Sequence, residues 1–89
     1  MNTSLSFNEA LLITDNAFKP LQCIAWTLQE GTGEVSISVM DTFANPVISS
    51  YSIPSHVLTS SSLLNKVLSE KRQQLQQQGL ELHVWSMPR

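Results

Sequence analysis

The sequence predicts an α+β protein in which two helices cover one face of an antiparallel sheet, in the order α-β-β-β-α with an extra C-terminal strand. Two segments, at about 7–18 and 59–79, have apolar residues at helical spacing, and shorter segments between and after them alternate apolar with polar residues. Glycine or proline separates each segment from the next. Because 89 residues suffice for one core, we expect a single domain over 1–89, with residues 1–5 disordered.

The first helix is expected at about 7–18. Ser6 and Glu9 fit a capping box, in which each side chain binds a backbone N–H group that the helix start leaves unpaired. Pro20 ends the helix because the residue before a proline is pushed out of the α region. Leu12 falls among the polar residues. The apolar face of this helix comprises Phe7, Ala10, Leu11, Thr14, Ala17 and Phe18.

Residues 21–28 and 34–41 are expected to pair as a β-hairpin. The intervening Glu-Gly-Thr-Gly, residues 30–33, fits a four-residue loop with glycines for positive φ. This loop length sets Trp26 opposite Ile37, and it sets Ile24 opposite Val39 and Leu28 opposite Val35. One apolar face would then lie beneath the helices. The outer face would carry Ala25, Thr27, Ser36 and Ser38.

The rest of the chain completes the fold. A third strand, 47–53, follows an Asn-Pro turn signal and stops at Pro54, with Ser50 and Ser52 on the outer face and Tyr51 and Ile53 on the core face. Several hydroxyl residues at 59–62 supply N-caps for the second helix, which Gly79 ends. Residues 80–86 alternate apolar and polar side chains, which predicts a fourth, half-buried strand.

Composition narrows the class of function. With 42% apolar and 13% charged residues the chain is globular, and its formal charge of −2 gives no positive field to attract phosphate backbones. The single cysteine, Cys23, cannot close an intrachain disulfide, and no secretory pattern precedes it, so we expect a cytoplasmic protein. No run of 18 apolar residues predicts a membrane span.

Nucleic-acid binding is the alternative function, because α-β-β-β-α is also the order of the double-stranded RNA-binding domain. In that domain, cations at the start of the second helix cross the phosphates of the major groove. Here Lys66, Lys71 and Arg72 point in three directions around the helix. Lys71 is expected along the apolar face, and Lys66 faces Glu70. Scattered cations disfavour phosphate binding because affinity grows with the counterions released together.

No catalytic, metal or cofactor-binding site is predicted, so we expect no enzyme and no cofactor. Cys23 with His56 or His83 would supply a nucleophile and a base, but no local signature joins them, and a cysteine in a strand is usually a small apolar filler. The two histidines with Asp41 or Glu81 form a weak set of metal ligands. A small enzyme or ligand carrier is a third alternative, which requires a pocket.

The first hypothesis is therefore a non-enzymatic interaction module that forms a homodimer. The outer face of the predicted sheet is nearly uncharged, so a second layer could cover it without burying charge, and Trp85 is expected to be exposed for contact. The dimer would form by sheet stacking or by addition of the C-terminal strand to an open edge. The alternative is a monomer with a hydrated face. The candidate interface residues are Leu12, Ser36, Ser38, Ile48, Ser50, His83 and Trp85.

Two short motifs also resemble a known family. Residues 18–23, F-K-P-L-Q-C, lie between the first helix and the first strand, and L-T-S-S at 58–61 opens the second helix. Together they resemble the DUF1652 family of small Pseudomonas-type proteins of unknown function, over about residues 11–75. The resemblance implies a bacterial, soluble, single-domain protein without a known activity. The family has an arginine after L-T-S-S, where this chain has Ser62, so no role of that cation is implied here.

Overall fold

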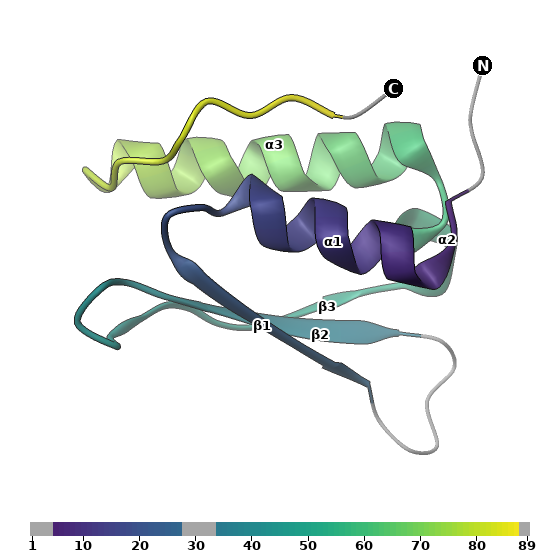
Figure 1. The fold of residues 1–89 in the computed structure, drawn as a ribbon, viewed down its shortest axis with the longest axis horizontal. Coiled ribbons are helices and arrows are strands. Elements are labelled where there is room, and N and C mark those ends of the chain that lie inside the picture. The colour runs from purple at the N-terminus through teal and green to yellow at the C-terminus, as the bar shows by residue number, and fades with distance from the viewer. Residues whose placement is uncertain (1–4, 28–33, 88–89) are drawn as a thin grey trace.

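The computed structural model describes residues 5–27 and 34–87, and it confirms the α-β-β-β-α order (Figure 1). The strands form one antiparallel sheet in the order β1-β2-β3, with α1 and α3 on the same side of it. The predicted loop 30–33 and Leu28 lie outside the described residues, as do residues 1–4 of the expected disordered start. The elements are α1 (Phe7–Ala17), β1 (Gln22–Thr27), β2 (Val35–Met40), β3 (Pro46–Ile53), α2 (Ser55–Leu58) and α3 (Ser61–Gln77).

The helices start and end as local chemistry dictates. The Ser6 hydroxyl accepts the Glu9 backbone N–H at 3.1 Å at the start of α1. Ser60 caps α3 in the same way, and Gly79, with a φ of 92°, follows its end. The short helix α2 was not predicted; it begins directly after Pro54, which ends β3 and is the N-cap of α2. Its last residue, Leu58, is buried.

The predicted register of β1 is wrong by one residue. Thr27, and not Leu28, lies opposite Val35, so Trp26 lies opposite Ser36 and Ile24 opposite Ser38. Because successive side chains of a strand point to opposite faces, this slip moves Ile24 and Trp26 from the core to the outer face. The observed pairs fit a different register from the one that the assumed four-residue loop implied, and that loop itself lies outside the described residues.

Small side chains take the inner positions of β1. Cys23, Ala25 and Thr27 lie opposite Val39, Ile37 and Val35, and α1 packs on this side of the strand. Val35, Ile37 and Val39 of β2 are fully buried and form the centre of the sheet's inner face. The buried core comprises Ala10, Ile13, Ala17, Phe18, Leu21, Val35, Ile37, Val39, Ile53, Leu58, Leu64, Leu68 and Leu75.

The prediction of a fourth strand is wrong. Residues 80–87 form no strand; they run along α3 on the side away from the sheet (Figure 1). Leu80, Leu82, Trp85 and Met87 pack against the core, whereas Val84 is fully exposed, so the alternation breaks after Leu82. The chain reverses at Gly79 and runs back along α3, so this segment does not lie beside an edge strand of the sheet.

Candidate interaction surface

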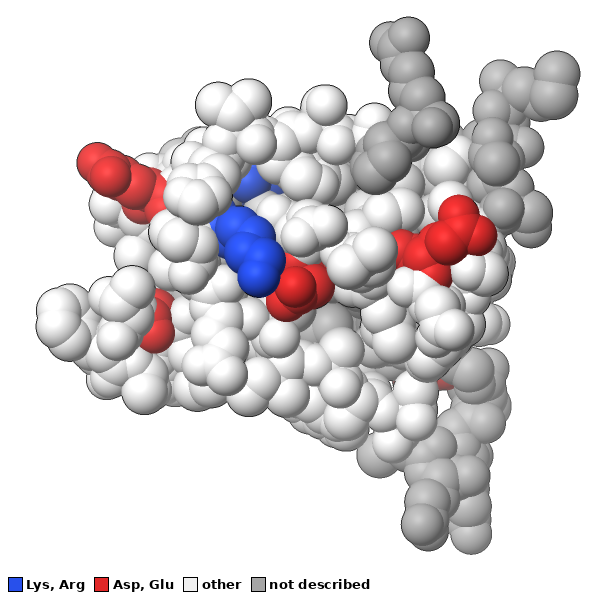
Figure 2. Space-filling model, in the orientation of Figure 1, with Lys and Arg blue, Asp and Glu red and all other residues white. Residues whose placement is uncertain are grey.

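The edge strand β1 is unusually open for part of a core sheet. All its side chains except that of Cys23 are exposed, whereas every second side chain of β2 is buried. Ile24 and Trp26 are 41% and 40% exposed on the outer face. In Figure 1 β1 passes in front of β2. In Figure 2, charged side chains gather along α1 and at the left of the view, and the area where Figure 1 draws β1 is uncharged.

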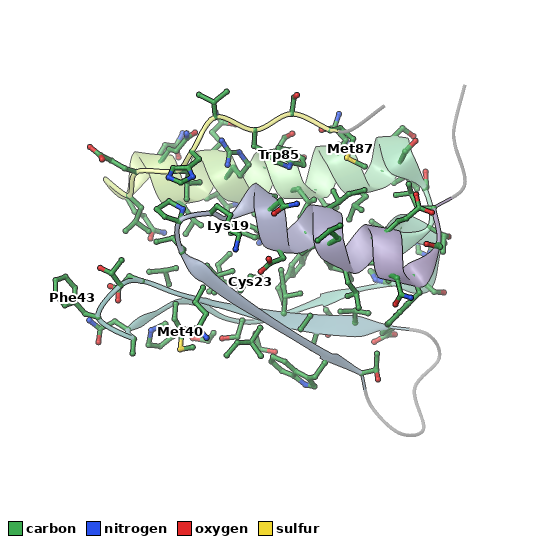
Figure 3. The ribbon with its side chains drawn as sticks, in the orientation of Figure 1. Lys19, Cys23, Met40, Phe43, Trp85 and Met87 are labelled. Atoms are coloured by element: carbon green, nitrogen blue, oxygen red, sulfur yellow. The ribbon has the colours of Figure 1, made fainter. Side chains whose placement is uncertain are left out.

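The outer face of the sheet presents hydroxyl groups beside these apolar residues. None of the three strands contains a charged residue. The hydroxyls of Ser36 and Ser52 lie 3.4 Å apart, and the Ser38 hydroxyl donates to the Ile48 carbonyl at 3.2 Å. Met40 points to this side of the sheet and Cys23 to the helix side (Figure 3). A second protein layer could therefore cover the face without burying an unpaired charge.

A groove opens on the other side of β1, between this strand and the start of α1. Its volume is about 160 Å³, comparable to a cavity that holds one benzene ring. Trp26 borders both the groove and the outer face, so the two surfaces are continuous. Phe7, predicted on the apolar face of α1, is 44% exposed here. The lining residues are Phe7, Leu11, Ala25, Trp26, Thr27 and Val35, none of which titrates near neutral pH.

The predicted interface residues do not form one surface. Ser36 and Ser38 lie on the outer face of the sheet, and Ser50 is exposed on β3. Ile48, expected on that face, packs against the core instead, because the register of β2 with β3 shifts between Ile37 and Val39. Leu12 is 63% exposed on α1, as its place among polar residues predicted. His83 and Trp85 belong to the C-terminal segment, beyond α3.

Ile24 and Trp26 are the surface residues that the sequence-based prediction missed. Their large apolar side chains favoured a buried position, and the assumed four-residue turn predicted the register that buries them. The opposite signal was also present, since Cys23 and Ala25 are small enough to let a helix approach the strand closely.

Arg72 binds the C-terminal segment to the helices. Its Nη1 donates to the Ala17 carbonyl at 2.6 Å, and its Nη2 donates to the His83 carbonyl at 2.9 Å. The guanidinium also lies 5.6 Å from the centre of the Trp85 ring. Burial lowers the pKa of Arg72 from its ordinary value, but the group stays charged at neutral pH. Trp85 is therefore half-buried against Arg72, which corrects the expectation that it is exposed.

The other three cations of the described residues, Lys19, Lys66 and Lys71, do not converge on one surface. Lys71 Nζ lies 4.2 Å from the centre of the Tyr51 ring, as expected for a lysine along the apolar face. Lys19 pairs with Asp15 at 3.5 Å. Lys66 is exposed, and its expected pairing with Glu70 is not among the ion pairs of the described residues. Among residues 5–27 and 34–87, this arrangement offers phosphates no cluster of free positive charge.

The Cys23 thiol is held in its protonated form. Burial, with a smaller contribution from the charge of Asp15, raises the pKa of Cys23 to about 11. The thiol is therefore a poor nucleophile at neutral pH. In the part of the chain that the structure describes, no group of three or more His, Cys, Asp or Glu side chains is placed to hold a metal ion.

This raised pKa predicts how stability depends on pH. Because the folded state keeps the proton that the unfolded chain loses near pH 9, Cys23 stabilises the fold below about pH 9 and loses this contribution as pH rises to about 11. We expect a loss of roughly 1–2 kcal/mol after allowance for partial exposure. Urea unfolding at pH 8, 9 and 10.5 measures it. An equal slope in Cys23→Ala, which lacks the thiol, would attribute the loss to other groups.

Comparisons with family models, curated proteins and solved structures found no match to this chain. The resemblance to the DUF1652 family stays a prediction. Within the residues that the structure describes, no helix combines the length and the apolar content that crossing a bilayer requires.

Proposed function

We propose that this chain is a non-enzymatic interaction module that self-associates through the uncharged surface around β1. The observation that carries this proposal is the exposure of Ile24 and Trp26 side by side on an edge strand without charged residues. Clusters of exposed apolar residues, and tryptophan in particular, are characteristic of protein interfaces.

The energetics favour burial of this surface. Covering the exposed part of one Trp26 ring would remove about 100 Å² from water, which is worth roughly 2 kcal/mol. A symmetric dimer gains this contribution twice, because the same patch is used on both subunits. β1 carries no charged residue, so burying it leaves no charge unpaired.

The proposal predicts a concentration-dependent dimer. Sedimentation velocity between 1 and 200 μM should show the wild-type chain shifting from monomer to dimer, with a Kd in the micromolar range. Trp26→Ser should weaken the dimer at least about 10-fold, since 1.4 kcal/mol changes Kd tenfold.

Val84→Ser is the matched control, because it removes an exposed apolar side chain from the far side of the molecule. It should leave Kd unchanged. A wild-type chain that stays monomeric at 200 μM would refute self-association, and equal effects of the two substitutions would refute the role of the β1 surface.

A further inference from the structure

The geometry points to one mode of association: β1 pairs in antiparallel fashion with β1 of a second copy, around a two-fold axis at Ala25. This inference rests on the proposed self-association and names its contact. The occupant of the open edge is thus a second copy of the same chain, and the product is one continuous six-stranded sheet.

The first argument is that β1 has none of the features that protect edge strands. Charged residues, prolines and bulges normally prevent an edge from pairing with another strand. β1 contains no charge and no proline, and its six residues pair with β2 without a register shift. The other edge strand, β3, begins at Pro46, and its pairing with β2 is interrupted twice. An additional strand is therefore accepted more readily at β1.

The second argument is the area that a dimer needs. Strands of 6, 6 and 8 residues cover roughly 300 Å² of sheet, at ~3.3 Å per residue and ~4.8 Å per strand. A standard-size interface buries about 800 Å² of accessible surface on each partner, so stacking of the outer faces and edge pairing would each give a small interface, in line with a micromolar Kd. Edge pairing adds backbone hydrogen bonds and uses both faces of β1, together with the mouth of the groove beside α1.

The third argument selects the register. A two-fold axis perpendicular to the sheet keeps both outer faces on the same side, so each residue must oppose one of the same orientation. With the axis at Ala25, Ile24 lies opposite the partner's Trp26, and this apolar pair occurs twice. On the inner face, Ala25 lies opposite itself. An axis at Ile24 would instead set Gln22 against the partner's Trp26 and lose an apolar pair.

A residue on a two-fold axis faces its own copy, which provides a charge-swap test. Ala25→Lys alone and Ala25→Glu alone each place like charges opposite each other, and each should weaken the dimer at least 10-fold. An equimolar mixture of the two variants should form a heterodimer with a Kd within about threefold of that of the wild-type dimer. Recovery in the mixture also shows that both variants are folded.

Ser52→Lys is the control for the competing geometry, because Ser52 is exposed on the outer face of β3, away from the β1 edge. It should leave the dimer intact. A wild-type dimer that Ser52→Lys disrupts and the Ala25 variants leave unchanged would overturn edge pairing and establish stacking. Weakening by both Ala25 variants without recovery in the mixture would overturn the axis at Ala25. A wild-type monomer would instead refute self-association itself.

Discussion

Replacing Ile37 with alanine is expected to lower the free energy of unfolding by about 3 kcal/mol, whereas the same substitution at Ile24 costs about 1 kcal/mol or less. Both residues are isoleucines in neighbouring strands, but Ile37 is fully buried and Ile24 is 41% exposed. The difference follows from the register of β1, since removal of buried methyl groups leaves a cavity and removal of exposed ones does not.

Urea unfolding followed by circular dichroism measures both values. Sub-micromolar protein keeps the chain monomeric, so that loss of dimer contacts does not add to the cost at Ile24. Equal costs at the two positions would mean that Ile24 is buried, and they would support the register that the hairpin loop predicted from sequence.

Arg72→Ala is expected to cost about 2 kcal/mol, because it removes two charge-assisted hydrogen bonds and the contact with the Trp85 ring. Amide hydrogen exchange of residues 80–87 should rise with this loss, since the His83 carbonyl loses its link to α3. Unfolding in urea gives the free energy, and exchange read by mass spectrometry gives the local effect.

Two further substitutions separate geometry from charge. Arg72→Lys keeps the positive charge but cannot reach both carbonyls with a planar fork, so it should recover only part of the stability. Lys66→Ala removes an exposed cation of the same helix and should change stability by less than about 0.5 kcal/mol. If Arg72→Ala behaves like Lys66→Ala, the apolar contacts and the hydrogen bond from the His83 N–H to the Lys19 carbonyl hold the C-terminal segment without Arg72.

These contacts give the molecule two different sides. On one side, the C-terminal segment lies along α3 and is held by Arg72 and by the hydrogen bond from the His83 N–H to the Lys19 carbonyl. On the other side, no described segment covers the outer face or the free edge of β1. The C-terminal segment thus lies against one part of α3, whose other face stays exposed, and the described residues leave the outer face of the sheet uncovered.

The sequence by itself determined the element order, because helix caps, prolines and glycines act over a few residues. Ser6, Ser60 and Gly79 occupy the cap positions that local hydrogen bonding requires, and Pro54 ends β3. The alternation of β2 was equally clear, since Val35, Ile37 and Val39 face the core in both the prediction and the structure.

Only the tertiary structure decided which face of β1 is buried and where the C-terminal segment lies. Along β1, large apolar residues alternate with small ones, so either set could face the core, and the sequence pattern fits both registers. Packing of α1 against the strand selects the register in which Cys23 and Ala25 face the helices. Likewise, residues 80–86 alternate as a strand does, but Arg72, distant in sequence from Ala17, holds them against the helices. In both segments, contacts between residues far apart in the chain decide the structure where the local alternation of apolar and polar residues does not. In β1 they place Trp26 on the outer face of the sheet.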